Sequence, residues 1–228
     1  MGTIAGMRCA HPVRVAIDGV DAAGKTSLAD ELVIPLQALG RPVIRASVDG
    51  FHNPRSIRYR RGADSPEGYF RDSFNYDALR CSLLVPLGPG GSLLYRPAVF
   101  DWRKDSEIEV LTRLASPESI LLLDGVFFLR PELRDFWDLR IWVEASFEVA
   151  VGRAELRQRD AGHDVTGLRE RYGCRYVPGQ RLYMAECRPR EQADVVVDNN
   201  DLQNPRLARR VRPRSERPRF RRVLCGPS

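Results

Sequence analysis

Residues 19–26 carry the clearest chemical signal in this chain. They are Gly-Val-Asp-Ala-Ala-Gly-Lys-Thr and fit the phosphate-binding pattern G-x-x-x-x-G-K-[ST] at every fixed position. In such a loop, backbone N–H groups and the start of the following helix face phosphate oxygens. Lys25 would bring a positive charge to the outer phosphates, and the hydroxyl of Thr26 could ligate Mg²⁺. The pattern predicts a nucleoside triphosphate site, the alternative being a chance match in a glycine-rich turn.

Three acidic residues close apolar segments and are candidates for the remaining chemistry. Asp18, Asp49 and Asp124 each stand at the end of such a segment and are each followed by glycine. The carboxyl ends of parallel strands meet at one edge of a sheet, where ligands bind. Asp18 leads into the phosphate loop and is expected to support it. Asp124 could be an acid beside Mg²⁺, and Asp49 could accept the proton of a substrate hydroxyl, although an Asp-Gly turn explains Asp49 equally well.

The elements that must position these residues alternate between short apolar segments and longer amphipathic ones. Strands are predicted at residues 13–17, 42–48, 119–123, 139–143 and 193–197, and helices at 25–39, 77–85 and 146–159. Pro35 would kink or shorten the first helix. Residues 51–75 have no clear period, and residues 92–104 suggest an extended excursion or a small hairpin. The pattern predicts an α/β fold, a P-loop three-layer sandwich with about five mainly parallel strands and helices on both faces.

The charge of the chain is unevenly distributed. Of 228 residues, 36 are Lys or Arg and 30 are Asp or Glu, which gives a net charge of +6. Residues 206–222 hold nine arginines and one acid, so the remainder, with 27 bases and 29 acids, is slightly acidic. We therefore expect no specific nucleic-acid partner. The expected organisation is an N-terminal lead at 1–12, one domain at 13–204, and an Arg-rich tail at 205–228 that has too few apolar residues to fold alone.

The remaining composition bears on the compartment. The five cysteines are scattered along the chain, which fits a reducing environment. No apolar run approaches the roughly 18 residues of a membrane span, and the N-terminus lacks the apolar core of a signal peptide. We expect a cytoplasmic protein without a membrane partner. The sequence leaves the oligomeric state open, with a homo-oligomer as one outcome.

Two further segments, together with the phosphate loop, resemble a known family. Ser47-Val48-Asp49-Gly50-Phe51-His52 and Leu123-Asp124-Gly125-Val126-Phe127 are similar to motifs of the uridine/cytidine kinase branch of P-loop kinases, which also includes pantothenate kinase and phosphoribulokinase relatives. The resemblance covers about residues 13–198. It implies ATP and Mg²⁺ as cofactors, a P-loop kinase domain at 13–204, and a helical lid at about 153–176.

The resemblance also implies roles for individual residues. Asp49 would be the catalytic base, and Lys25 and Arg157 would assist phosphoryl transfer. The residues implied for nucleotide binding are Gly19, Asp21, Ala22, Ala23, Gly24, Lys25, Thr26, Ser27, Arg153 and Arg157. Those implied for the metal are Thr26, Asp49 and Asp124, and those for the substrate are Asp49, Phe51, His52, Tyr69, Phe70, Tyr95 and Arg159. Arg153 and Arg157 share one face of a helix, which suits phosphate binding and also an ordinary solvated face.

These observations predict an ATP-dependent small-molecule kinase that phosphorylates the 5′-hydroxyl of uridine or cytidine. The alternatives are a kinase for another hydroxyl acceptor, pantothenate- or sugar-like, and a nucleotide-dependent regulatory protein. His52 stands where uridine kinases usually have Tyr, and Phe70-Arg71-Asp72-Ser73 stands where they have Phe-Asp-His-Pro. The acceptor therefore stays open among these alternatives.

Overall fold

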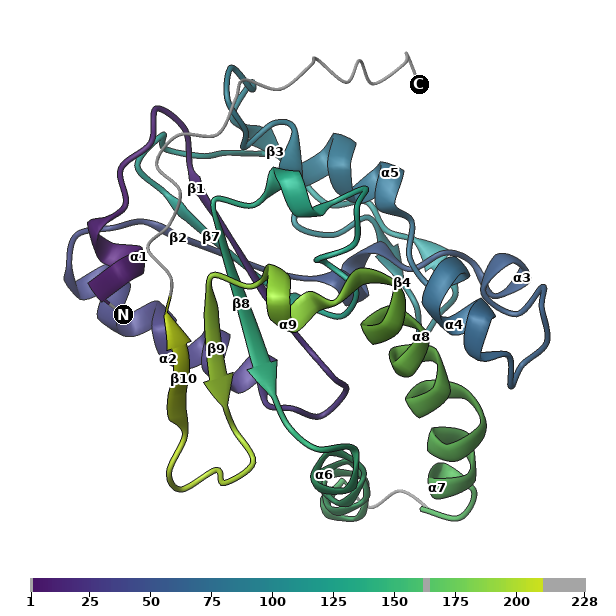
Figure 1. Ribbon diagram of the computed structural model, residues 1–228. Helices are drawn as coiled ribbons and strands as arrows, with labels where there is room; N and C mark the ends of the chain where they lie inside the picture. Colours follow the sequence, from purple (N-terminus) through teal and green to yellow (C-terminus); the bar gives the residue numbers. More distant parts are fainter. Residues whose placement is uncertain (1, 162–164, 211–228) are drawn as a thin grey trace.

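A central sheet with helices beside it forms the body of the protein (Figure 1). The computed structural model describes residues 2–161 and 165–210. The sheet has six strands in the order β10-β9-β8-β1-β7-β2. Their bounds are β1 Val13–Gly19, β2 Val43–Ser47, β7 Ile120–Gly125, β8 Leu139–Glu144, β9 Val195–Asp198 and β10 Arg206–Arg210. All strands of this sheet except β10 run parallel, which confirms the predicted α/β fold.

The centre of the sheet brings the predicted strand ends together. Every residue of β1 and β7 is buried, as expected for apolar strands in a parallel sheet covered on both faces. β1 lies between β7 and β8, and β2 pairs with the other side of β7. In this register Asp124 lies beside Ile17 of β1 and Ser47 of β2. The carboxyl ends of three strands therefore form one continuous edge.

Helices flank the sheet. Helix α2 packs against β1, β2 and β7, whereas α4, α5 and α8 lie across the sheet from it in Figure 1. The α-helices are α1 Gly2–Gly6, α2 Lys25–Ala38, α3 Arg55–Arg58, α4 Pro66–Asp72, α5 Tyr76–Leu79, α6 Phe147–Asp160, α7 Leu168–Arg171, α8 Val177–Cys187 and α9 Pro189–Gln192. Two 3₁₀ turns, η1 Val48–Phe51 and η3 Arg134–Phe136, and two π-helical turns, η2 Arg80–Leu84 and η4 Tyr172–Tyr176, complete them. Within the described part of the chain, no helix is long and apolar enough to cross a bilayer.

Three segments add detail that the sequence pattern did not predict. Helix α2 continues through Pro35 to Ala38, so the proline does not shorten it. Residues 51–75 contain α3 and α4, whose four and seven residues are too few to show a helical period. The predicted excursion at 92–104 takes part in two short ladders. In these ladders β3 Leu94–Tyr95 pairs with β6 Arg113–Leu114, and β4 Phe100–Asp101 pairs with β5 Ser106–Glu107.

Strand β10 lies in the segment predicted to be an unfolded tail. Residues 206–210 pair antiparallel with β9, so the sheet continues past the predicted boundary at residue 204. The prediction was wrong for these residues because an edge strand is held by backbone hydrogen bonds and tolerates charged side chains. Residues 211–228 of the predicted tail and residues 162–164 of the predicted lid lie outside the described residues.

Asp18 anchors the strand that enters the phosphate loop. Its buried carboxylate accepts hydrogen bonds from the backbone N–H groups of Gly19, Phe128 and Leu129 and from the hydroxyl of Tyr183. Burial raises the pKa of Asp18 to about 6, although these hydrogen bonds oppose the shift. Asp18 thus ties the end of β1 to the turn after β7 and to α8, and its support of the phosphate loop through Gly19 stays a prediction.

Candidate active site

The phosphate loop connects β1 to α2 in the predicted way. Gly24 has a φ of 95°, which suits glycine, and a Cβ there would lie 2.5 Å from the side-chain nitrogen of Asn199. That same nitrogen donates a 2.7 Å hydrogen bond to the backbone oxygen of Ala23. Asn199 follows β9, so the end of a distant strand fixes the shape of the loop. Thr26 and Ser27 follow in the first turn of α2 and are exposed.

Lys25 is buried at the start of α2. Its Nζ donates a 2.6 Å hydrogen bond to the backbone oxygen of Val20, so the side chain folds back over the loop. Burial lowers the pKa of Lys25, and the nearby carboxylates of Asp21 and Asp18 oppose that shift. The amine therefore stands inside the loop among carboxylates, where an incoming phosphate would meet it.

Asp124 and Thr26 form a direct pair at the end of β7. The hydroxyl of Thr26 donates a 2.6 Å hydrogen bond to Oδ2 of Asp124. The other carboxylate oxygen, Oδ1, lies 2.7 Å from Nη1 of Arg45 on β2. The structure thus brings together two of the three residues predicted for the metal.

Asp49 lies in the 3₁₀ turn η1, directly after β2. Although the residue as a whole is exposed, protein atoms surround its carboxyl group closely enough that loss of solvent raises its pKa to about 6. The negative charges of Asp124 and Asp21 raise the pKa further, whereas Lys25 and Arg103 lower it. Because Ser47, two residues earlier, pairs with Asp124 at the carboxyl end of β7, Asp49 lies at the same edge of the sheet as the phosphate loop. A group with this pKa suits the base that was predicted at this position.

The three residues predicted for the metal form a donor set that fits Mg²⁺. Thr26 offers a hydroxyl, and Asp49 and Asp124 offer carboxylates, so all donors are hard oxygen atoms. Burial is the main cause of the raised pKa of Asp49, and the negative charges of Asp124 and Asp21 add to it; a divalent cation would offset those charges. These residues could therefore hold a magnesium ion next to the phosphate loop.

Asp21 connects the phosphate loop to the helices across the site. Its Oδ2 accepts a 2.6 Å hydrogen bond from the hydroxyl of Tyr69 on α4 and a 3.2 Å hydrogen bond from Nε2 of Gln180 on α8. The backbone N–H of Asp21 in turn donates to Oε1 of Gln180 at 2.7 Å. Burial and the charge of Asp21 raise the pKa of Tyr69 well above its ordinary value, so its proton stays on the hydroxyl. Tyr69, predicted to contact substrate, instead holds the loop.

His52 belongs to an aromatic cluster beside Asp49. Its Nδ1 donates a 3.0 Å hydrogen bond to the backbone oxygen of Asp49, and its ring lies 4.5 Å from that of Phe74 and 5.8 Å from that of Trp102. Burial lowers the pKa of His52 to about 4, so the imidazole is neutral at physiological pH. The guanidinium of Arg103 covers the ring of Trp102 at 5.3 Å. This aromatic cluster contacts the predicted base, Asp49, through the hydrogen bond of His52.

Three residues predicted to contact substrate lie in the core instead. Phe51 and Phe70 have 0% and 1% of their surface exposed, and Tyr95 is also buried. The ring of Phe70 packs at 5.2 Å from that of Phe127. In the sequence, an aromatic side chain is equally compatible with core packing and with substrate binding. The burial of these three side chains shows that they pack in the core. They are therefore removed from the set of candidate substrate contacts.

The predicted lid arginines have different surroundings. Arg153 on α6 donates to the backbone oxygens of Asn199 and Asn200 at 2.7 and 3.0 Å, next to the residue that holds the phosphate loop. Arg157 and Arg159 are exposed further along the same helix. The structure thus brings Arg153 to the loop region, whereas Arg157 and Arg159 lie at the surface.

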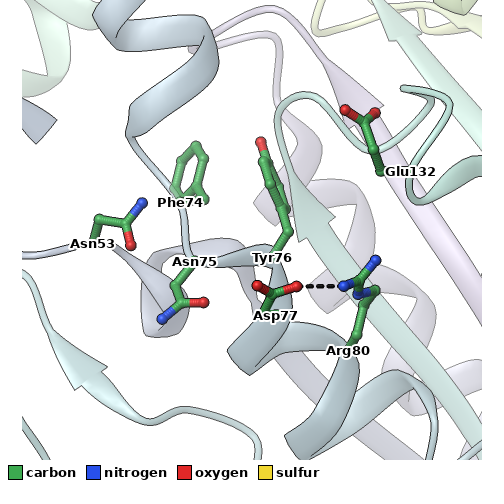
Figure 2. Close-up of a pocket in the computed structure, with 7 residues that line it drawn as sticks. All are labelled: Asn53, Phe74, Asn75, Tyr76, Asp77, Arg80 and Glu132. Atoms are coloured by element: carbon green, nitrogen blue, oxygen red, sulfur yellow. Dashed lines mark hydrogen bonds and ion pairs between the residues drawn. The ribbon is translucent and has the colours of Figure 1, made fainter. Parts of the chain in front are cut away.

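A surface cavity of about 400 Å³ adjoins the aromatic cluster through Phe74. Figure 2 shows its polar wall, in which Asp77 and Arg80 form an ion pair. The hydroxyl of Tyr76 is buried and has no hydrogen-bond partner among the described residues. The residues that line the cavity are Asn53, Phe74, Asn75, Tyr76, Asp77, Arg80 and Glu132.

The sequence analysis also missed three residues that are remote in sequence but form hydrogen bonds with residues of the site. Arg45, Gln180 and Asn199 bind Asp124, Asp21 and Ala23, and they come from β2, α8 and the end of β9. No motif surrounds them in the sequence. Only the alternation of strand residues could have indicated that Arg45 points away from the core.

Comparisons with known proteins agree with this geometry. No family model matches the chain. It is 25% identical over 201 residues to the uridine kinase of Chlamydia pneumoniae, which covers 83% of each chain. Among solved structures, a possible uridine kinase from Bacillus stearothermophilus superposes with a TM-score of 0.68 at 22% identity, covering 86% of this chain and 93% of that one.

A phosphoribulokinase from Rhodobacter spheroides superposes with a TM-score of 0.55 at 17% identity, covering 89% of this chain and 76% of that one. The likeness therefore extends over most of the molecule. This chain has the α/β fold of the P-loop kinases and is similar in sequence to uridine kinases.

Proposed function

We propose that this protein transfers the γ-phosphoryl group of ATP to a hydroxyl group of a small molecule, and that the acceptor is the 5′-hydroxyl of uridine or cytidine. The observation that carries the proposal is Asp49, a carboxylate with a raised pKa that is coupled electrostatically to Lys25 and Asp124. A base on the acceptor side is needed for transfer to an alcohol. The similarity to uridine kinases supports this class of reaction and this acceptor.

Each residue of the site would have a distinct role in this reaction. Bound Mg²⁺ would offset the charge of the β- and γ-phosphates, and Thr26, Asp124 and Asp49 are the residues that would hold it. Lys25 supplies a positive charge inside the phosphate loop. Asp49 accepts the proton of the acceptor hydroxyl while that oxygen bonds to the γ-phosphorus, and the bond to the ADP oxygen breaks. The proton on Asp49 then returns to water.

The aromatic cluster supports a planar acceptor such as a nucleoside. Two of its rings, those of the half-buried His52 and the exposed Trp102, could stack on the acceptor, whereas the ring of Phe74 is buried. The cavity beside Phe74 leaves room for the part of the acceptor that does not react. Rings of this kind stack readily on flat groups. Arg157 and Arg159 on α6 would close on the nucleotide in this proposal, since they are exposed near the predicted lid.

A panel of acceptors tests the proposed function directly. Uridine, cytidine, pantothenate and several sugars would each be incubated with ATP and Mg²⁺, and both ADP and the phosphorylated product would be measured. We expect phosphorylation of uridine or cytidine at the 5′-hydroxyl. If only pantothenate or a sugar is phosphorylated, the protein is still a kinase, but its acceptor is that compound and not a nucleoside. ADP release without any phosphorylated acceptor would favour a regulatory protein that hydrolyses ATP.

The pH dependence of the reaction should report the pKa of Asp49. Because this pKa is raised to about 6, the carboxyl group becomes protonated and loses its function as a base below that pH. We expect kcat/KM to fall about tenfold for each pH unit below 6 and to reach a plateau above it. A rate profile measured from pH 4 to 8 checks this, and a rate that stays constant from pH 7 down to pH 5 would contradict the shift.

A further inference from the structure

Arg45 occupies an unusual position in the middle of strand β2. Its Nη1 lies 2.7 Å from Oδ1 of Asp124, and the same nitrogen donates to the backbone oxygen of Ala46 at 2.7 Å. Its Nε lies 2.8 Å from Oδ1 of Asp30 on α2. One planar guanidinium thus binds two carboxylates through nitrogens whose relative positions are fixed, whereas the ammonium of a lysine has no such rigid arrangement of donors.

Both oxygens of Asp124 are consequently occupied. Oδ1 accepts from Arg45, and Oδ2 accepts from the hydroxyl of Thr26. The side chain of Asp124 is only 4% exposed, so it has little room to turn. A short, charge-assisted hydrogen bond to the buried carboxylate from the partly exposed Arg45 fixes direction as well as charge. Of the two oxygens, Oδ2 is the one directed at the Thr26 hydroxyl and hence at the candidate metal site.

We propose that Arg45 is a positioning residue for the metal site. It holds Asp124 so that a single oxygen faces the cation beside Thr26, and its positive charge limits the affinity of that site for a divalent ion. This inference rests on the proposed function, because it takes Thr26 and Asp124 as the residues that hold Mg²⁺. What it adds is the effect of Arg45 on the direction of the Asp124 carboxylate and on the affinity of the site for the ion.

A purely architectural role for Arg45 makes a different prediction. In that case the ion pair with Asp30 would contribute as much to the stability of the fold as the pair with Asp124, because it joins β2 to α2. The side chain of Asp30 is 61% exposed, however, and exposed ion pairs contribute little to stability. Asp30→Asn therefore removes one partner of Arg45 without touching Asp124, and it is the matched control.

Metal affinity and turnover together test the proposal. Mn²⁺ binding would be followed by electron paramagnetic resonance at pH 8 with a non-hydrolysable ATP analogue present, and kcat would be measured with Mg²⁺ and the preferred acceptor. In Arg45→Gln the positive charge is lost, so we expect Mn²⁺ to bind about threefold to tenfold more tightly. Because Asp124 can then turn, we expect kcat to fall about tenfold. Asp30→Asn should match the wild type in both.

A second variant separates charge from direction. Arg45→Lys keeps the positive charge but loses the rigid planar donors that fix the direction of Asp124, so we expect near wild-type Mn²⁺ affinity with a reduced kcat. Thermal unfolding of each variant would show that the fold is intact. Unchanged affinity in Arg45→Gln, or affinity and kcat that fall together with the melting temperature, would overturn the proposal.

The metal measurement also keeps this proposal distinct from the proposed function. If the wild type binds Mn²⁺ with the nucleotide but phosphorylates no acceptor, the kinase proposal fails, and the role of Arg45 is still decided by the affinities. If the wild type binds no Mn²⁺ with the nucleotide, both proposals fail.

Discussion

Replacing Asp49 by Asn is expected to lower turnover by about 100-fold or more while leaving ATP binding nearly unchanged. The amide keeps the size of the side chain and cannot accept a proton from the acceptor hydroxyl. ATP binding should persist because the loop residues that face the phosphates, Lys25 among them, are untouched. Steady-state kinetics with saturating acceptor and a calorimetric titration with ATP would measure the two quantities separately.

The control for this variant is Asp30→Asn, which removes an equal charge from the exposed face of α2. It should retain turnover close to that of the wild type. If Asp49→Asn kept wild-type turnover, Asp49 could not be the base, and the Asp-Gly sequence would be explained by the 3₁₀ turn η1 that it forms. Loss of ATP binding in that variant would point to the metal site rather than to the acceptor.

Replacing Lys25 by Ala is expected to abolish phosphoryl transfer, with a loss of about 1000-fold or more. The amine is the positive charge buried within the phosphate loop, where the transferring phosphoryl group would gain negative charge. Without it, the carboxylates of Asp21, Asp49 and Asp124 face the phosphates with less compensation. ADP formation over time, measured by a coupled assay, checks this expectation.

The fold should survive the change at Lys25. The amine donates to the backbone oxygen of Val20, which also accepts a 3.1 Å hydrogen bond from the backbone N–H of Ala23, so losing the amine costs only about 0.5–1.5 kcal/mol. Lys104, the other lysine of the chain, is exposed in a turn, so Lys104→Ala is the matched control and should be fully active. Retained turnover in Lys25→Ala with unchanged circular dichroism would refute the nucleotide assignment.

The strands of the parallel sheet and the phosphate loop could be predicted because each is encoded by a contiguous stretch of sequence. Residues 19–26 are contiguous, and their function depends on backbone geometry that the sequence itself encodes. The apolar runs at β1, β7 and β8 are long enough to require burial on both faces. The strand β10 gave no such signal, because its arginines lie at an edge where only backbone bonding is needed.

The acceptor side could be predicted only in part. The sequence placed Asp49 and His52 together because they share one turn, and the structure adds Phe74 and Trp102 from other segments. Phe51 and Phe70 show why residue type alone does not select a binding residue. An aromatic ring serves a core and a ligand equally well, and its direction is set by the packing around it.

The sequence by itself therefore determined the phosphate loop, the parallel sheet and the acidic residues at the strand ends, since each depends on neighbours along the chain. The tertiary structure alone decided which groups meet across the site. Arg45 meets Asp124 through the register of β2 and β7, and Asn199 reaches the loop from the end of β9. Such contacts depend on how distant segments pack. No spacing in the sequence encodes them, because the chain between the partners can vary without changing the contact.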